Sequence, residues 1–419
     1  MRLGATFGTL AEREFRLLFL GRLVSFLGSA FAPVAIAFAV LQVGSASDLG
    51  LVLAASMLPT VLFVLVGGVI ADRLPRHTVL VVSNLVSGAA QGLFAVVIVS
   101  GHAQLWELIA IQAVRGVSTA FFFPAAQGIV PEVVSAGRLQ AANVLLRLSR
   151  NTTSILGAAV AGIVVAAAGP AWGLAVDAVS YLLAALFMAR IELLPRARRE
   201  TPAFVRELVE GWDEFRSRTW LWVVVVAFGV LNAAQAGAFN VLGPPIAKEH
   251  LGGAASWGFI LATLSAGLIV GGLVALRWRP RRALLVGCLC VAFQVPPLLL
   301  LAIPAPTAAI AGAAFLEGVG IELFGIYWDT SLQQHVPREA LSRVSSYDAL
   351  GSWVLMPIGF AVVGPIASLV GTRETLFGAS ALIGLAVLAM AATADIRRLT
   401  AAPSAAPASE TEVTAPLPG

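Results

Sequence analysis

The sequence predicts an all-α membrane protein in which about twelve transmembrane helices form two six-helix pseudo-repeats. Of its 419 residues, 58% are hydrophobic and 12% are charged, whereas about a quarter of the residues of a soluble protein are charged. The charges fall in short clusters between long apolar runs, and short motifs recur half a chain apart. Roughly 240 apolar residues, at about 20 per crossing, suffice for about twelve spans. This composition excludes a soluble enzyme, a disordered chain and a single-span receptor.

The hydropathy pattern places six spans in each half of the chain. The spans expected in the first half are 16–42, 49–71, 78–99, 104–127, 149–168 and 171–190. Those expected in the second half are 220–246, 255–276, 283–302, 307–329, 346–370 and 375–392. The first apolar run passes Ala30-Phe31-Ala32, which resembles a signal-peptide cleavage site, and is longer than the apolar core of such a peptide. We therefore expect an uncleaved helix.

The arginines predict the orientation of these spans. The amino terminus, the central loop, the tail and the loops on the same side carry 23 arginines, against Lys248 and Arg373 on the other side. Basic loops of a membrane protein face the cytoplasm. Both termini are therefore predicted to be cytoplasmic, which requires an even number of spans. The same rule explains the formal net charge of +4 without a nucleic-acid partner.

An internal repeat predicts the domain organisation. The stretch 68–76 recurs in altered form at 272–281, and Val130-Pro131 recurs as Val336-Pro337, both offset by about 205 residues. A duplicated chain of this kind is typical of transporters built from two halves. We expect an amino-terminal six-helix half at 1–190, a basic cytoplasmic linker at 191–219, a carboxy-terminal half at 220–399, and a disordered Ala- and Pro-rich tail at 400–419.

The linker carries an apolar stripe among charged residues. Its members lie close to one helical face: Phe204, Leu208, Trp212 and Phe215. Such a stripe is typical of an amphipathic helix lying on the cytoplasmic membrane surface. A plain cytosolic linker helix accounts for the pattern equally well.

The loop between the second and third spans has a recognisable pattern. Its residues Gly68-x-x-x-Asp72-Arg73-x-x-Arg76 resemble the loop motif of the major facilitator superfamily. The segments Phe123-Pro124-Ala125, Val130-Pro131 through Asn143, and Val176-Asp177-Ala178 resemble its drug-efflux branch, which includes macrolide and enterobactin-type siderophore exporters. The chain departs from the family pattern at Pro75, at His77 and at Gly157-Ala158, where the fifth-span antiporter motif has Gly-Pro.

The loop motif has a physical rationale as a gate. Gly68 permits close helix approach, and Arg73 and Arg76 can hold the Asp72 carboxylate in one state or bridge to the opposite half. A carboxylate that is paired in one conformation and released in another biases a two-state equilibrium. The alternative is that these charges only set the topology.

Asp72→Asn should abolish transport if Asp72 gates, because the uncharged amide no longer forms the state-dependent ion pair. Membrane insertion and ligand binding should stay largely intact, since neither depends on that pair. Transport assays on membranes with matched expression measure this. Normal transport by the variant would remove the gating role.

Charged side chains within the spans are few, and they indicate where substrate passes. They are Arg22, Arg115, Asp177, Glu317 and Glu322, and the seventh span adds the polar residues Asn232, Gln235 and Asn240. A charge in hydrocarbon costs about 2.5–3.5 kcal/mol on insertion scales, so each should face a cavity or a partner. The resemblance implies that spans 1, 4, 7 and 10 line the central cavity, and four of the five charges lie in spans 1, 4 and 10.

Several roles remain open for these residues. Glu317 or Glu322 can carry a proton, because removal from water favours the protonated form of a carboxyl group. Arg115 can hold an acidic substrate group or neutralise a glutamate, and the alternative is a static ion pair between helices. Arg22 can snorkel to the interface, and Asp177 is either structural or handles protons.

The sequence contains no pattern for a cofactor or a catalytic centre. The histidines lack metal-ligand spacing, and Cys288 and Cys290 have the environment of packing residues. There is no Gly-rich loop ending in Gly-Lys-Ser or Gly-Lys-Thr, so an ATP-binding subunit is not expected. The expected partners are a small-molecule substrate, protons and the lipid bilayer.

These observations and the resemblance together predict a secondary transporter of the bacterial inner or plasma membrane. The resemblance implies proton-coupled efflux of an amphipathic molecule, such as a drug, a macrolide or a siderophore, by alternating access. The competing prediction is a proton-coupled uptake permease for a metabolite. A membrane-embedded enzyme or scaffold is a further alternative, but no convergent set of His and carboxylate residues supports it.

Overall fold

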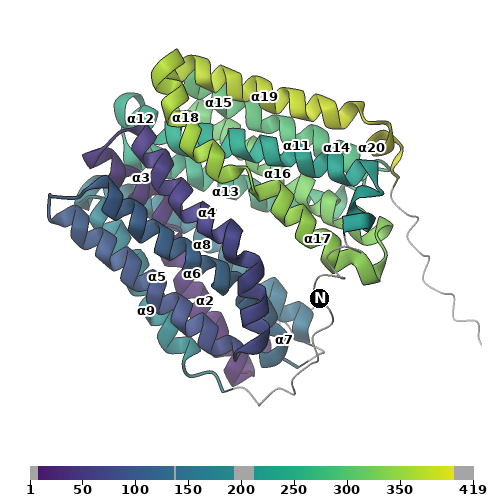
Figure 1. Cartoon of the computed structure of the whole chain (residues 1–419), viewed down its shortest axis with the longest axis horizontal. Coiled ribbons are helices and arrows are strands. Elements are labelled where there is room, and N and C mark those ends of the chain that lie inside the picture. The colour runs from purple at the N-terminus through teal and green to yellow at the C-terminus, as the bar shows by residue number, and fades with distance from the viewer. Residues whose placement is uncertain (1–7, 136–137, 193–211, 401–419) are drawn as a thin grey trace, which may run out of the picture.

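A computed structural model describes residues 8–135, 138–192 and 212–400; within these ranges the side chains of 65–66, 68–73, 140, 338–339 and 342–343 are not described. The described residues form helices and no strands. Twelve helices or joined helices are long and apolar enough to cross a membrane. The predicted all-α fold with twelve spans is therefore confirmed (Figure 1).

The first half contributes six of these spans. Its helices are η1 (Gly8–Ala11), α2 (Arg13–Ser29), α3 (Ala32–Val43), α4 (Ala46–Arg73), α5 (Arg76–Val99), α6 (Leu105–Gly128), α7 (Val130–Val133), α8 (Leu139–Ala168) and α9 (Pro170–Met188). The fifth expected span, 149–168, is the second part of α8, which begins ten residues earlier.

The second half contributes the other six spans. Its helices are α11 (Thr219–Gly237), η3 (Ala238–Leu242), α12 (Gly243–Ile246), η4 (Ala247–Leu251), α13 (Ala254–Arg277), α14 (Ala283–Cys290), η5 (Val291–Gln294), α15 (Val295–Ala302), α16 (Thr307–His335), α17 (Arg338–Trp353), α18 (Met356–Val370), α19 (Thr372–Ala392) and α20 (Ala394–Arg398). The expected linker and tail lie mostly outside the described residues.

Prolines divide four of the spans into shorter helices. Pro33 lies at the start of α3, Pro296 at the start of α15 and Pro357 at the start of α18. In the seventh span, Pro244 and Pro245 lie between two π-helical turns, η3 and η4. Proline lacks the backbone N–H that continues a helical ladder, so the hydrogen-bonding pattern changes at each of these positions.

The turns between the spans lie at two opposite ends of the molecule. We call the end that holds the chain termini the terminal end, and the opposite one the far end. The terminal end holds the starts of α2 and α5, the short helices α7 and α20, and both described chain ends. The far end holds the turns at Gly44, Gly169, Gly252 and Gly371. In Figure 1 the ribbons of the two halves lie together near α3, α12 and α18 and diverge toward α7 and α17.

Equivalent helices pack in the same way within each half. The hydroxyl of Thr60 on α4 donates to the carbonyl of Gly116 on α6, 3.0 Å away. The hydroxyl of Thr263 on α13 donates to the carbonyl of Ala311 on α16, 3.1 Å away. Because α4 and α6 are spans 2 and 4 whereas α13 and α16 are spans 8 and 10, the two contacts have the same place in the six-span order.

The two halves meet through glycines on two helix pairs. On α8 and α13, a Cβ added to Gly258 would lie 2.7 Å from the Cα of Gly162. On α4 and α18, a Cβ added to Gly364 would lie 2.4 Å from the Cα of Ser47. At these positions only glycine allows so close an approach of the backbones.

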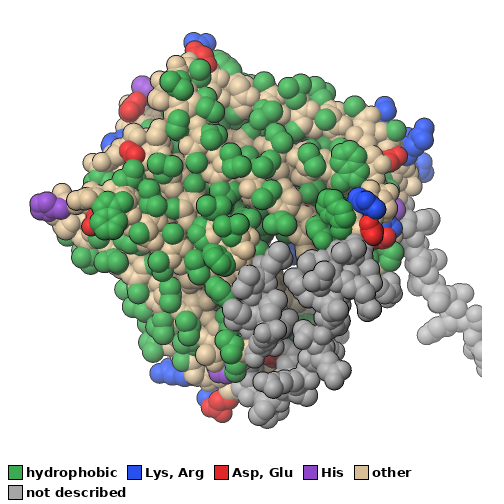
Figure 2. Space-filling model, in the orientation of Figure 1, with side chains coloured by type: hydrophobic (Ala, Val, Ile, Leu, Met, Phe, Trp, Pro, Cys, Tyr) green, Lys and Arg blue, Asp and Glu red, His purple; other side chains and the backbone are tan. Residues whose placement is uncertain are grey.

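The outer surface is apolar between charged ends. Many large hydrophobic residues are exposed, among them Leu62, Val96, Ile163, Leu276 and Leu388. Figure 2 shows hydrophobic side chains spread over the visible face and charged ones gathered at its margins. A lipid bilayer would cover a band of this kind, whereas a soluble protein would bury it.

Candidate functional site

The amino-terminal half contains a buried polar network centred on Asp177 of α9. The Asp177 side chain has no exposed surface. The Gln91 amide on α5 donates to its Oδ2 across 2.6 Å, and the Gln112 amide on α6 donates to the Gln91 oxygen across 3.2 Å. The network therefore links spans 3, 4 and 6 through side chains that lie out of contact with lipid.

Arg115 of α6 lies against the same network. Its Nη2 donates to the hydroxyl of Tyr181 across 3.5 Å, and the Ser29 hydroxyl of α2 donates to the same Tyr181 oxygen across 3.0 Å. Its guanidinium interacts electrostatically with Asp177. Arg115 and Asp177 therefore attract each other within one half, although no direct ion pair joins them among the described residues.

Glu317 of α16 has a different environment. Its side chain is 1% exposed, and the Gln235 amide of α11 donates to its Oε1. Its Oε2 has no hydrogen-bond partner, and in the described part of the chain no Lys, Arg or His lies within ion-pair distance. An isolated carboxylate without a cation is very costly to bury, so the neutral carboxylic acid is the favoured form here.

Glu322 lies on another face of α16, toward the opposite half. It interacts electrostatically with Arg147 and Arg150 of α8, and Asp329 interacts with Arg147. Arg22 of α2 is partly buried and interacts with Arg150. A basic group on the first half and an acidic group on α16 therefore face each other across the boundary between the halves.

The remaining polar residues of the seventh span bond to nearby backbone. The Asn232 amide donates to the carbonyl of Ser352 on α17 across 3.0 Å. The Asn240 amide donates to the carbonyl of Ala236 in its own span across 3.1 Å. Of the three expected pathway residues on this span, Gln235 is the one bonded to an acidic side chain.

Aromatic side chains border the same region. The Arg22 guanidinium lies over the rings of Phe26 and Phe122, 4.8 and 5.5 Å from their centroids. The rings of Phe123 on α6 and Trp353 on α17 meet edge to face, with centroids 6.4 Å apart, so they join the two halves. Apolar and cationic surfaces thus lie next to each other, as binding of an amphipathic molecule requires.

The loop motif is described only in part. Arg76 donates to the Gly128 carbonyl at the end of α6 and forms a 3.0 Å ion pair with Glu132 of α7. It therefore ties the start of α5 to the end of the fourth span. The side chains of Asp72 and Arg73 lie outside the described residues, as do the surroundings of Gly68.

Sequence reasoning missed several members of these groups. Gln91, Gln112 and Tyr181 carry no charge and lie one or two to a span, whereas the uncharged residues that were singled out form a group of three within the seventh span. Arg147 and Arg150 were counted only among the 23 arginines that set the orientation, although their spacing of three places both on one face of a helix, here α8. Asp329 follows Glu322 by seven residues, or about two helical turns, so the two side chains share a helix face. This spacing could have identified Asp329 from the sequence.

Nothing in the described chain resembles a metal centre: no group of three His, Cys, Asp or Glu residues is placed to hold an ion. Cys288 is buried and Cys290 partly buried, and both are free thiols.

Curated proteins resemble the chain over nearly its whole length. It is 24% identical to macrolide efflux protein A of Streptococcus pyogenes, covering 92% of this chain and 97% of that protein. It is 24% identical to the multidrug efflux pump Tap of Mycolicibacterium fortuitum, over 84% and 89% of the two chains. It is also 24% identical to the enterobactin exporter EntS of Escherichia coli, over 94% and 95%.

Solved structures share its fold at low identity. A crystal structure of the nucleoside transporter NupG matches with a TM-score of 0.71 and 13% identity, over 92% of this chain and 99% of that one. An inward-facing, unoccupied bacterial homologue of the human lysosomal transporter Spinster matches with a TM-score of 0.71 and 14% identity, over 92% and 97%. Residues 18–359 match the sequence pattern of the family described as the Major Facilitator Superfamily. The chain is a multi-pass membrane transporter, not an enzyme, and belongs to the major facilitator superfamily.

Proposed function

We propose that this transporter exports amphipathic small molecules from a bacterial cell in exchange for protons. One observation carries the proton coupling: Glu317 is buried at the boundary of spans 7 and 10, bonded to Gln235 and without a described cation. Such a carboxyl group is neutral while buried and can ionise when water or a cationic partner reaches it. It can therefore take up a proton in one state and release it in the other.

The direction of transport rests on the relatives. Three of them are named as a macrolide efflux protein, a multidrug efflux pump and an enterobactin exporter. With the arginine-rich terminal end in the cytoplasm, the polar residues between the diverging halves would receive substrate from the cell interior. The inner or plasma membrane is the location that this orientation requires.

The polar residues divide into groups with different proposed roles. Glu317 carries the proton and Gln235 positions its carboxyl group, whereas Arg115 and Asp177 hold the first half together. Arg22, Asn232, Asn240 and Glu322 line the substrate pathway. Asp72 with Gly68, Arg73 and Arg76 acts as the gate at the terminal end, a role that follows from the loop motif in the sequence.

Proton flux in energised inside-out vesicles tests the proposal. A pH-sensitive dye reports the vesicle lumen while macrolides, siderophores and cationic dyes are added one class at a time. We expect proton release from the lumen with at least one class, and no release in vesicles that lack the protein. Proton entry into the cytoplasm drives export, so movement in the opposite sense, or silence across the panel, would contradict proton-coupled export and favour the uptake alternative.

A further inference from the structure

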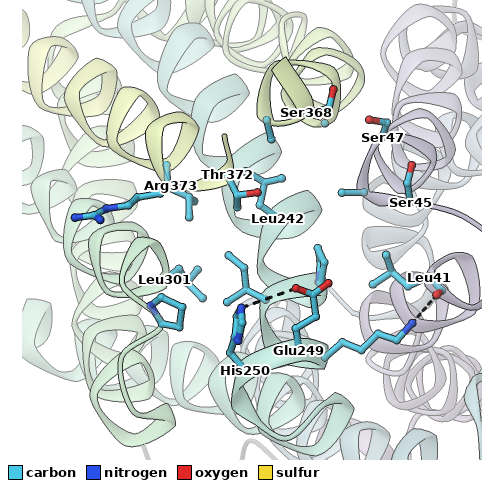
Figure 3. Close-up of a pocket in the computed structure, with 18 of the residues that line it drawn as sticks. Leu41, Ser45, Ser47, Leu242, Glu249, His250, Leu301, Ser368, Thr372 and Arg373 are labelled. Carbon is cyan, nitrogen blue, oxygen red and sulfur yellow. Dashed lines mark hydrogen bonds and ion pairs between the residues drawn. The ribbon is translucent and has the colours of Figure 1, made fainter. Parts of the chain in front are cut away.

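The far end of the molecule contains a bond between the halves that the proposed transport site does not use. The ammonium group of Lys248, at the end of the seventh span, donates to the backbone carbonyl of Leu41 across 2.7 Å. Leu41 lies in the last turn of α3 in the first span. Figure 3 shows this bond joining a ribbon of the second half to a ribbon of the first.

The acceptor suits a cation. The last carbonyls of a helix have no partner within the helix, and they form the negative end of its dipole. Here the α3 helix ends at Val43, and the Gly44 N–H bonds to Val40, which leaves the Leu41 carbonyl available to Lys248. A charged donor on a helix end makes a stronger bond than a neutral one. Lys248 therefore caps a helix that belongs to the other half.

The surroundings of this bond belong to both halves. A pocket of about 590 Å³ lies beside it, with walls formed by Leu41 and 44–47 of the first half and by residues of spans 7, 9, 11 and 12 of the second half. At its edge the backbones of Ser47 and Gly364 are in close contact. Movement of the two halves apart at the far end would have to break the Lys248 bond and reshape this pocket.

We propose that Lys248 is a positioning residue that holds the far end of the transporter closed by bonding to the Leu41 carbonyl. The inference rests on the proposed alternation of the two ends. The experiment that tests the role of Lys248 measures a distance in the purified protein and needs neither substrate nor proton flux. The role of Lys248 can therefore fail or succeed independently of proton-coupled export.

The chain supplies a matched control in Arg373. This residue lines the same pocket on the second half, where His250 also lies, and is the one Arg of the far end beside Lys248. Its guanidinium lies over the Phe377 ring of its own helix, 5.4 Å from the centroid, and in Figure 3 it extends away from the first half. Arg373→Met therefore removes a positive charge from the pocket without removing a bond between the halves.

Distances between spin labels test the proposal. One pair of labels, at His102→Cys and Ile303→Cys, reports the distance between the halves at the far end. A second pair, at Leu74→Cys and Asp395→Cys, reports it at the terminal end. Cys288 and Cys290 are replaced by Ala so that they carry no label. A hydrogen bond from a charged donor contributes enough that its loss changes an equilibrium by roughly tenfold or more. Lys248→Met should therefore shift the far-end population toward the longer distance by about tenfold and shorten the terminal-end distance.

The controls separate this role from a general effect on structure. Lys248→Arg keeps a charged donor and should retain the wild-type distances, and Arg373→Met should do the same. Each variant is first checked for a monodisperse elution profile and an unchanged melting temperature. Unchanged distances in Lys248→Met, or the same shift in Arg373→Met, would overturn the proposal.

Discussion

Glu317→Gln should lose pH-driven accumulation of the transported molecule by at least tenfold, while exchange of substrate across the membrane continues. Glutamine has nearly the same shape and can still bond to Gln235, but it cannot release a proton. Because Glu317 is buried and has no described cation nearby, the amide imitates the protonated state, in which the binding site stays intact. Accumulation driven by an imposed pH gradient, compared with exchange at equal pH, measures the effect in proteoliposomes.

Glu322→Gln provides the matched comparison on the same helix. Glu322 is only partly buried and faces Arg147 and Arg150 of the other half, so its substitution should alter substrate affinity or the balance of states and leave coupling in place. Full pH-driven accumulation by Glu317→Gln would exclude Glu317 as the proton carrier. Loss of coupling in Glu322→Gln alone would transfer that role to Glu322.

Arg115→Met should lower the free energy of unfolding by about 1–3 kcal/mol, the usual cost of leaving a buried polar group without its partner. Asp177 would then remain fully buried with the Gln91 amide and no compensating cation. The Tyr181 hydroxyl would also lose its contact with Arg115. Unfolding of the detergent-solubilised protein by a denaturing detergent, followed by circular dichroism, measures the change.

The double variant Arg115→Met with Asp177→Leu tests the pairing itself. Replacing both members removes the unpaired charge, and apolar replacement of a buried pair is often neutral or stabilising. The double variant should therefore be more stable than Arg115→Met alone, with a coupling energy beyond about 1 kcal/mol in the thermodynamic cycle. If the two losses simply add, Arg115 and Asp177 act independently.

The fold was predictable from the sequence because a membrane imposes a strict length on each span. Twelve apolar runs of about 20 residues allowed few arrangements, and the structure has a helix on each of them. The positions at which a proline interrupts a span were less predictable. Pro33, Pro296 and Pro357 begin new helices, whereas Pro59 lies within the continuous helix α4, because neighbouring helices decide whether a proline ends a helix.

The site was predictable only as a set of unusual residues. The cost of a charge in hydrocarbon singled out Arg115, Asp177 and Glu317, but it could not say which of them would meet. Partners on different helices depend on how each helix is rotated and where it crosses its neighbours. For this reason the pairing of Glu317 with Gln235, and of Arg115 with Tyr181, became visible only in the structure.

The glycine contacts between the halves have a mechanical consequence. Where α8 meets α13 and α4 meets α18, backbone lies against backbone at Gly162, Gly258 and Gly364. Interlocked side chains would have to be withdrawn from one another before either half could turn, as in a tightly packed core. Smooth surfaces of this kind can roll over each other with little loss of contact, so the same positions that hold the halves together also let them pivot.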